Sequence, residues 1–424
     1  MVTRLGKPLV AVALVLGVVS LGGGAPAGAA SRPPIKHVFV IVLENKGFDE
    51  TFGPDSKAPY LANELPKLGQ VLTNFYGTGH ASLTNYVAMV SGQAPTKATQ
   101  TDCLASYDDV KPGTPSADGQ VVGDGCVYPA SVKTIADQMT VKGLTWKGYM
   151  QDMGTPCRHA ESGKPDSTIH NTPGDQYAAR HNPFVYFHSI LDGPDCAKND
   201  VDLSKLLGDL STAAATANYT FITPNVCEDA HDSPCVDSAP GGLQSADGFL
   251  KTWVPRIMGS PAYADGGMLV VTFDEAQLSD STACCNEPSG PNVSQPGFGN
   301  GPGGGRTGTV VISSAVPKGT LNDTPMNHYS MLRGIEDLFG LEHLGYAGQA
   351  GLEGIDSVFD ASRTPSTLPR PTPTTVRVGA GAPLPRTGSA NGPLLVMAIL
   401  LFASGAVLII GGRRRAAPRS RLSR

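Results

Sequence analysis

An uninterrupted apolar run near the start of the chain constrains the fold more than any other feature of the sequence. Residues 37–43 read HVFVIVL, which is apolar, mostly β-branched and free of polar alternation. Such a run is typical of a strand buried on both faces in the parallel sheet of an α/β protein. Glu44 and Asn45 follow it directly. They are either an ordinary strand-to-loop transition or the start of a site, because open α/β sheets bind ligands beyond the carboxyl ends of their strands.

Two later segments repeat the pattern of a predicted strand that ends in polar residues. Residues 218–223 are followed by the segment CEDAHD, and residues 267–273 form the cleanest buried strand of the chain. Only 16% of the residues are charged, so three carboxylates and a histidine within five residues favour a metal or catalytic cluster over a solvated acidic loop. The candidate residues are Asp229 and His231 after the strand predicted at 218–223, and Asp274 and Glu275 after the strand predicted at 267–273.

A serine stands at the start of a predicted helix that Gly92 closes. A glycine-bearing loop leads into this residue, Ser82. Ser82 either caps the helix, which is the usual role of a serine there, or acts as a nucleophile. In the second case the helix N-terminus supplies N–H donors and a positive dipole to a phosphoryl group. His80 and Asn85 are close enough in sequence to line the same pocket.

Two further histidines are candidates for the site. His181 precedes the residues NPF within the segment 101–199, which is rich in Cys, Gly, Pro and Asp and predicts a loop-rich insertion with short helices. The stretch around His181 either contacts the site or makes a turn only. His328 falls just before a predicted helix at 331–339.

The cysteine pattern predicts a framework of disulfides. All eight cysteines lie between Cys103 and Cys285, and no CxxC metal spacing occurs. An even number of cysteines in an exported chain indicates disulfides rather than zinc. Proximity in sequence predicts three pairs, and the adjacent Cys284 and Cys285 either bond to each other or reach elsewhere. The three pairs are Cys103–Cys126, Cys157–Cys196 and Cys227–Cys235.

The first thirty residues predict export. Residues 1–30 carry Arg4 and Lys7, then an apolar stretch, then small residues that are typical of a secretory cleavage site. We expect removal of this signal near Ala29 or Ala30, the alternative being an uncleaved anchor. The folded catalytic domain is then predicted at 31–360.

The last sixty residues predict an anchor at the cell surface. Residues 361–392 are rich in Pro, Thr and Gly and predict a linker, 393–412 a membrane-spanning segment, and 413–424 a basic cytoplasmic tail. The sequence LPRTG at 384–388, with this apolar span and tail, resembles the sorting signal of Gram-positive surface proteins. The resemblance implies cleavage after Thr387 by a sortase and attachment to peptidoglycan, or retention in the membrane if the chain is not sorted.

The charge of the exported part argues against nucleic acid as a stable partner. Without 1–30 and the residues after Thr387, 24 basic residues remain against 37 acidic ones, which is a net charge of −13. Binding to a phosphate backbone requires a basic surface. An acidic chain is compatible with an exported enzyme and with divalent cations.

The candidate residues together predict a metallohydrolase of the α/β class. Carboxylate, amide and imidazole ligands from separate strands suit hard or borderline cations such as Zn, Ca, Mg or Mn. A cation would lower the pKa of the Ser82 hydroxyl, and Ser82 would form a phosphoseryl intermediate that water hydrolyses. Asp229, His231 and His328 would hold a second cation or supply a general acid. The expected metal ligands are Glu44, Asn45, Asp229, His231, Asp274 and Glu275.

Five motifs in this order carry a family resemblance: ENKGFDETFG, GHASLTNYVAMVSG, ITPNVCEDAHD, VVTFDEA and NHYSMLRGIEDLFGL. They resemble the secreted phosphoesterase family, which contains bacterial phospholipases C and acid phosphatases, and the similarity spans about 36–347. The resemblance implies an alkaline-phosphatase-like fold, in which a mostly parallel central sheet is flanked by helices. It also implies that Glu44 and Asn45 bind metal, that Ser82 is the nucleophile, that Asp274 and Glu275 form the later acidic pair, and that His231 and His328 are active-site histidines.

The sequence leaves the metal and the substrate open. Ala81 and Thr84 stand where many relatives have proline, and Glu275 replaces a second aspartate or a histidine, so the identity and number of cations are unresolved. The substrate is a small-molecule or lipid phosphoester, either a monoester, a diester or a phospholipid. Two rival functions remain. One is a metal-free serine hydrolase, although no GxSxG elbow surrounds Ser82. The other is a wall-anchored binding module with a vestigial site.

Overall fold

The computed structural model describes Met1 and residues 33–297, 301–360 and 366–367. The predicted signal peptide, most of the linker with LPRTG, the predicted membrane segment and the basic tail therefore lie outside the described residues. Within the described part, no helix is both long and apolar enough to cross a membrane.

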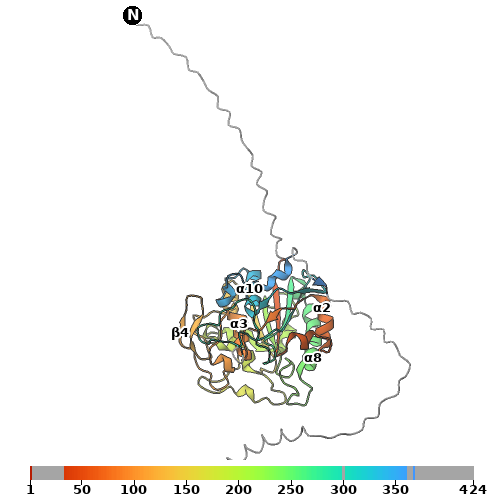
Figure 1. Cartoon of the computed structure of the whole chain (residues 1–424), viewed down its shortest axis with the longest axis horizontal. Coiled ribbons are helices and arrows are strands. Elements are labelled where there is room, and N and C mark those ends of the chain that lie inside the picture. Colours follow the sequence, from red (N-terminus) through yellow and green to blue (C-terminus); the bar gives the residue numbers. More distant parts are fainter. Residues whose placement is uncertain (2–32, 298–300, 361–365, 368–424) are drawn as a thin grey trace, which may run out of the picture. The chain divides into compact units, whose positions relative to one another are not determined.

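A nine-stranded sheet forms the centre of the described domain (Figure 1). Its order is β13-β11-β2-β10-β9-β1-β8-β6-β7. The pairs from β9 to β7 are parallel, whereas β10 runs antiparallel to both β9 and β2. The sheet strands are β1 His37–Leu43, β2 Gln70–Leu72, β6 Trp146–Met150, β7 Asp200–Asp202, β8 Tyr219–Thr223, β9 Gly267–Phe273, β10 Thr309–Ser313, β11 Thr320–Asn322 and β13 Ser366–Thr367. The α/β class with a mostly parallel sheet is thus confirmed.

Helices cover both faces of this sheet. Figure 1 shows α2 and α8 to the right of the view and α3 to the left. Two short ribbons lie outside the main sheet, β3 Phe75–Tyr76 with β12 Met326–Asn327 and β4 Lys111–Pro115 with β5 Val121–Asp124. The helices are α1 Phe48–Phe52, α2 Leu65–Leu68, α3 Ser82–Ser91, α4 Ile135–Val141, α5 His188–Leu191, α6 Asp195–Asn199, α7 Leu206–Asp209, α8 Gly242–Met258, α9 Pro261–Ala264 and α10 His328–Phe339.

Strand β1 divides the interior into two hydrophobic cores because successive side chains of a strand point to opposite faces. The first core takes side chains of α3, α4 and α10, and the second takes those of α2, α8 and α9. Every residue of β1 is buried, as the apolar run predicted. Val38, Val40 and Val42 enter the first core, and Phe39, Ile41 and Leu43 enter the second.

The ends of three helices refine the sequence-based expectations. Helix α3 begins at Ser82 and ends at Gly92, whose left-handed φ of 67° explains the glycine there. Helix α8 continues to Met258 through Pro255, although a proline inside a helix usually kinks or ends it. Helix α10 begins three residues earlier than predicted, so that His328 is its first residue and Asn327 caps it.

All four disulfides are in place. The three pairs predicted from proximity are confirmed, and Cys284 bonds to its neighbour Cys285. The segment 101–199 contains loops, short helices and two of these bonds, as expected. It also contributes β6, which pairs in parallel with β8 and β7 and so belongs to the main sheet.

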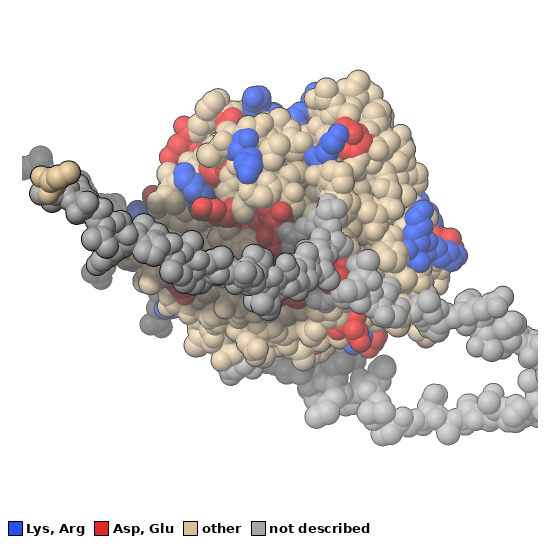
Figure 2. All heavy atoms as spheres, turned by 90° about the horizontal axis from the view of Figure 1, so that it is seen from above, with Lys and Arg blue, Asp and Glu red and all other residues tan. Residues whose placement is uncertain are grey.

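Charged side chains are interspersed on the surface. On the face seen in Figure 2, Lys and Arg lie among Asp and Glu. Arg306 is a charged residue with such a partner, because its guanidinium donates to Asp49 at 3.0 Å and also lies over the Phe48 ring.

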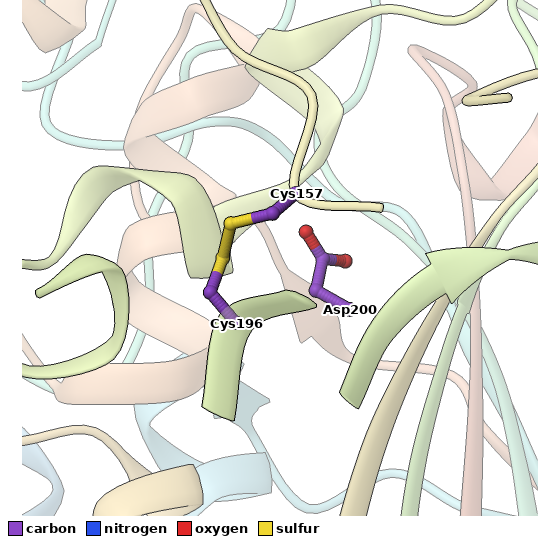
Figure 3. Close-up of side chains that lie close together, drawn as sticks. All are labelled: Cys157, Cys196 and Asp200. Carbon is purple, nitrogen blue, oxygen red and sulfur yellow. A yellow bond between two sulfur atoms is a disulfide. The ribbon is translucent and has the colours of Figure 1, made fainter. Parts of the chain in front are cut away.

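A buried aspartate lies beside one of the disulfides (Figure 3). Asp200 is fully buried next to the bond between Cys157 and Cys196, so this group is a cross-link beside a carboxyl rather than a set of free thiolate ligands. Asn182 Nδ2 donates to Asp200 Oδ2 at 2.7 Å, whereas Asp200 Oδ1 has no hydrogen-bond partner within the described ranges. Burial raises the pKa of Asp200 to about 7.

This aspartate should make folding stability depend on pH. Because its pKa is raised in the folded state, its contribution is fully present below the unfolded value near pH 4 and is lost as pH rises through about 7. In the wild type this titration should lower the free energy of unfolding by up to about 1.4 kcal/mol per pH unit as pH rises. We expect Asp200→Asn to lack this decline. Urea unfolding at pH 5 and pH 8 measures this. An unchanged pH dependence in Asp200→Asn would contradict the assignment, and Asp55→Asn, at an exposed carboxylate, should behave as wild type.

Candidate active site

The carboxyl ends of β1 and β9 bring the first candidate residues together. These strands are parallel neighbours in which Leu43 pairs with Phe273, so Glu44 and Asp274 leave the sheet side by side. The backbone N–H of Asn45 donates to Asp274 Oδ1 at 2.9 Å. The fold therefore places Glu44, Asn45 and Asp274 at one edge of the sheet, as predicted from the residues that follow each strand.

Ser82 points at Glu44 and does not cap its own helix. The serine Oγ donates to Glu44 Oε2 at 2.7 Å, and the side chain at the cap position, Ala81, offers no cap. Tyr86 lies one turn further on the same helix face and its hydroxyl donates to Glu44 Oε1 at 2.6 Å. Both carboxylate oxygens of Glu44 thus accept hydrogen bonds from side chains of α3. These bonds fix the Ser82 hydroxyl beside the N-terminus of the helix.

The carboxyl groups at this edge are buried close to one another, which disfavours their charged forms. Glu44 and Asp274 are fully buried, and Glu275 is nearly so. Burial raises the pKa of all three, and the neighbouring carboxylates raise the pKa of Glu44 and Glu275 further. Several acids crowded in a low-dielectric place would be stabilised by a nearby cation.

The donor atoms fit a metal ion. Asn45 Oδ1 and Asp274 Oδ2 are buried and have no hydrogen-bond partner among the described residues, although buried polar atoms are normally satisfied. Both are oxygens of the kind that hard divalent cations prefer. Glu44, Asp229 and His181 form a second group, whose ligand atoms lie within 4.8 Å of one another.

His80 and Glu275 form a buried pair. The two side chains approach at 2.6 Å between His80 Nδ1 and Glu275 Oε2, and His80 Nε2 lies 3.0 Å from the carbonyl oxygen of Asp280. Burial lowers the pKa of His80. His80 therefore orients Glu275, the second acid after β9.

His181 lies at the centre of the site, which confirms that the segment around it reaches the strand ends. Its ring stacks on Tyr86 with centroids 5.4 Å apart. Its Nδ1 lies 3.1 Å from Asp229 Oδ2 and its Nε2 3.5 Å from Glu44 Oε2. Burial lowers the pKa of His181 well below the ordinary value, which favours the neutral ring, the form that can bind a cation.

His231 lies at the open side of the site. Its backbone N–H donates to Asp229 Oδ1 at 2.7 Å, and its Nδ1 lies 2.8 Å from Asp232 Oδ1. Burial lowers the pKa of His231, but the bond to Asp232 and the charge of Asp229 outweigh this and raise it. Together with Asn45, His80, Ser82 and Glu275, it lines a cavity of about 780 Å³.

Two predicted residues lie behind the cavity wall. Asn85 Oδ1 accepts from the N–H groups of Thr78 and Gly79, and its Nδ2 donates to the Gly79 carbonyl, so this amide shapes the loop before Ser82. His328 is fully buried, with Nε2 against the carbonyl oxygen of Asp274, while Nδ1 has no hydrogen-bond partner in the part of the chain that the structure describes. Burial lowers the pKa of His328 to about 4.

Tyr86 and Asp102 belong to the site but were not predicted from the sequence. Tyr86 had a usable signal, since it stands four residues after Ser82 on a predicted helix and so shares its face. No sequence signal pointed to Asp102. This residue lines the cavity, and its Oδ1 accepts from the Leu83 N–H at 2.9 Å. The bond satisfies one of the N–H donors at the start of α3.

Comparison with known proteins identifies the family of this chain. Residues 56–342 match the phosphoesterase family. The chain belongs to this family. The match begins after Glu44 and Asn45, which the sheet register brings to the matched residues Asp274 and Glu275.

The curated relatives of this phosphoesterase include phosphatases from fungi and bacteria. A probable acid phosphatase of Kluyveromyces lactis is 25% identical over 73% of this chain and 59% of its own length. An acid phosphatase of Aspergillus fumigatus is 24% identical over 72% of this chain and 55% of its own length. The chain thus spans less than two thirds of these fungal proteins. A phosphatidylinositol-3-phosphatase of Mycobacterium tuberculosis is 23% identical over 76% of this chain and 83% of its own length.

Similar solved structures include a protein in the alkaline phosphatase superfamily from Vibrio parahaemolyticus. It has a TM-score of 0.43 and 14% identity, and the alignment covers 74% of this chain and 68% of that one. A sulfatase from Pseudoalteromonas sp. has a TM-score of 0.46 and 12% identity, with coverage of 80% and 74%.

Removing the Tyr86 hydroxyl tests how the phosphoesterase holds Glu44. In Tyr86→Phe one oxygen of a fully buried carboxyl loses its donor, which should lower the free energy of unfolding by about 1–3 kcal/mol. Tyr219→Phe is the matched control, because Tyr219 is equally buried but its hydroxyl has no hydrogen-bond partner among the described residues. Urea unfolding in the presence of a chelator measures both. Equal stability losses in the two variants would show that Glu44 does not depend on Tyr86.

Proposed function

We propose that this protein hydrolyses phosphoric esters in a metal-dependent reaction that proceeds through a phosphoserine at Ser82. The observation that carries the proposal is the 2.7 Å bond from Ser82 Oγ to Glu44, at the first residue of a helix and at the wall of a cavity. A helix N-terminus favours a bound phosphoryl group, and a serine fixed there can attack phosphorus.

The residues that would hold the cation are Glu44, Asn45, Asp274 and Glu275. Two of their oxygens, Asn45 Oδ1 and Asp274 Oδ2, have no other partner among the described residues. When bound, a divalent cation supplies positive charge that lowers the pKa of the Ser82 hydroxyl and neutralises charge on the phosphoryl oxygens. Zn, Ca, Mg and Mn all remain candidates.

The protein's own residues account for the proton movements. Ser82 Oγ forms the bond to phosphorus, and its proton lies on the hydrogen bond to Glu44 Oε2, which is positioned to accept it. His231 lines the cavity, and its Nδ1 is engaged with Asp232, so its Nε2 is available to give a proton to the leaving oxygen. In the second step water attacks the phosphoserine and gives a proton to His231, while the Glu44 carboxyl returns its proton to Ser82 Oγ as the bond to phosphorus breaks. Phosphate leaves, and Ser82, Glu44 and His231 are restored.

The substrate class follows from the relatives and from the open cavity. The acid phosphatases and the phosphatidylinositol-3-phosphatase among the relatives favour phosphomonoesters, either of small molecules or of lipids. A cavity of about 780 Å³ has room for a leaving group of either kind. Phospholipase C-like cleavage of a diester is the second candidate, which the sequence motifs support.

We also propose that the protein acts outside the cell. The secretory pattern in 1–30 and the sequence LPRTG at 384–388 support export and attachment to the cell wall by a sortase, with membrane retention of unsorted chains. Replacing Thr387 with alanine should move the protein from the wall fraction to the membrane fraction of a Gram-positive host. An unchanged distribution would contradict the sorting proposal and leave the enzymatic one untouched.

Replacing Ser82 tests the nucleophile. We expect Ser82→Ala to lower kcat for p-nitrophenyl phosphate by on the order of 10³ or more, because no other residue takes over the attack. Ser91→Ala in the same helix is the control, since the Ser91 hydroxyl bonds to backbone groups, donating to the Val87 carbonyl and accepting from the Gln93 N–H. Near wild-type turnover by a folded Ser82→Ala would exclude the phosphoserine route.

Removing the metal separates the proposed function from its rivals. Activity on p-nitrophenyl phosphate should be lost in EDTA and restored by one added divalent cation. Full activity in EDTA would favour the metal-free serine hydrolase. No turnover of this ester or of p-nitrophenylphosphorylcholine with any cation would favour the binding module.

A further inference from the structure

The segment 292–297 forms one wall of the cavity beside α3. The Pro296 carbonyl accepts from the N–H of His80 at 2.9 Å, and the Gln295 carbonyl accepts from Gln100 Nε2 at 2.8 Å. At its other end a side-chain amide ties the segment to strand β5, donating to one backbone group of that strand and accepting from another. This wall therefore runs from the loop that precedes α3 to the ribbon of β4 and β5.

Residues 97–102 line the cavity along the same direction. Asp102 lies at one end of this stretch, since its carboxylate accepts from an N–H in the first turn of α3. Ala98 lies at the other end, since its N–H donates to Asp124 of β5 at 2.9 Å. Lys97 precedes Ala98 and also lines the cavity. It therefore belongs to the end of the cavity that is near β5 and away from the proposed nucleophile.

Lys97 is the only lysine or arginine among the described residues that line this cavity. Its side chain is exposed, and it forms no ion pair with a carboxylate within the described ranges. The two carboxylates of the wall, Asp102 and Glu275, are bound to the first turn of α3 and to His80 instead. Other side chains of this wall are polar, which favours a polar ligand: Gln100, Asn292, Ser294 and Gln295.

The backbone on both sides of Lys97 is fixed. The Thr96 hydroxyl donates to the Gly125 carbonyl at 2.7 Å, and Ala98 is held by its bond to β5. The disulfide between Cys103 and Cys126 links the same two stretches of chain. The point from which the lysine side chain extends is thus set before a ligand arrives, which lowers the entropy cost of binding.

We propose that Lys97 forms a subsite for an anionic group on the leaving alcohol, an inference that rests on the proposed phosphoesterase function. The phosphoryl group lies at Ser82 during attack, so the leaving group occupies the remainder of the cavity. An ammonium on the wall there attracts a negative charge and discriminates against a neutral group of the same shape. The substrate class is then a phosphoester whose alcohol carries a second anionic group, such as a carboxylate or another phosphate.

A lysine that is only a solvated surface charge makes a different prediction. In that case no local cation favours an anionic leaving group, and the acidic charge of the exported chain acts against it. Charged and neutral ligands of equal shape should then bind equally, or the neutral one more tightly. A preference for the anion therefore requires a cation at the cavity wall.

The experiment measures the binding of two benzylphosphonates that differ in a single group. Neither can be hydrolysed as an ester, because carbon replaces the ester oxygen. One carries a para carboxylate and the other an isosteric, neutral para carbamoyl group. Calorimetry at neutral pH gives both dissociation constants for the purified protein saturated in turn with Mg, Mn, Ca and Zn. We expect the wild type to bind the carboxylate about 3-fold or more tightly than the amide.

Substitutions of Lys97 test whether its charge causes this preference. Lys97→Met should abolish the preference, Lys97→Glu should reverse it, and Lys97→Arg should retain it, because arginine keeps the charge. The control is Lys57→Met, since Lys57 is equally exposed but lies outside the residues that line the cavity. The two ligands share one phosphonate, so their ratio cancels any general change in affinity. High salt should weaken the preference.

The outcomes separate this inference from the proposed function. Equal affinities in the wild type, a preference that survives in Lys97→Met, or no binding of either ligand would overturn the subsite. If the preference depends on Lys97 but the wild type hydrolyses no phosphoester, the subsite stands and the hydrolase proposal fails. If p-nitrophenyl phosphate is hydrolysed while the wild type binds both ligands equally, the hydrolase stands and the subsite fails.

Discussion

The site depends on one buried carboxylate, Glu44, at the end of the central strand. Both of its oxygens accept hydrogen bonds from α3, one from Ser82 and one from Tyr86, and its backbone N–H donates to the Asp229 carbonyl. The nearby carboxylate of Asp274 raises its pKa beyond the effect of burial. A cation nearby would favour the charged form of this carboxylate, and the same bonds that hold it hold the serine. The proposed cation and the proposed nucleophile would therefore be coupled through a single side chain.

The sheet explains why residues distant in sequence meet at this point. Strands β8, β1 and β9 are parallel neighbours, and their carboxyl ends deliver the Asp229 loop, Glu44 and Asp274 to one edge. Helix α3 presents Ser82 to that edge, and the turn that holds Arg180 and His181 is fastened to the end of β8. In this arrangement His80 and His231 both line the cavity, together with Ser82 and Glu275.

Much of this could be predicted from the sequence because the signals were local. The buried strands are uninterrupted apolar runs, and the parallel arrangement alone places the residues after them at a common edge. Three disulfides followed from proximity in sequence. Strand β6 was not foreseen because its residues, WKGYM, mix polar and apolar types, and its burial comes from neighbouring strands and helices. The role of Asn85 was equally hidden, since a cavity-lining amide and one that ties a loop look alike in sequence.

Trapping the covalent intermediate tests the central claim most directly. The protein is mixed with a phosphomonoester and a divalent cation, quenched in acid within the first turnover, digested and analysed by mass spectrometry. The account predicts the added mass of one phosphoryl group on the peptide that contains Ser82, localised to that residue. A phosphoryl group on another residue, or rapid turnover with no phosphorylated peptide at any quench time, would contradict it.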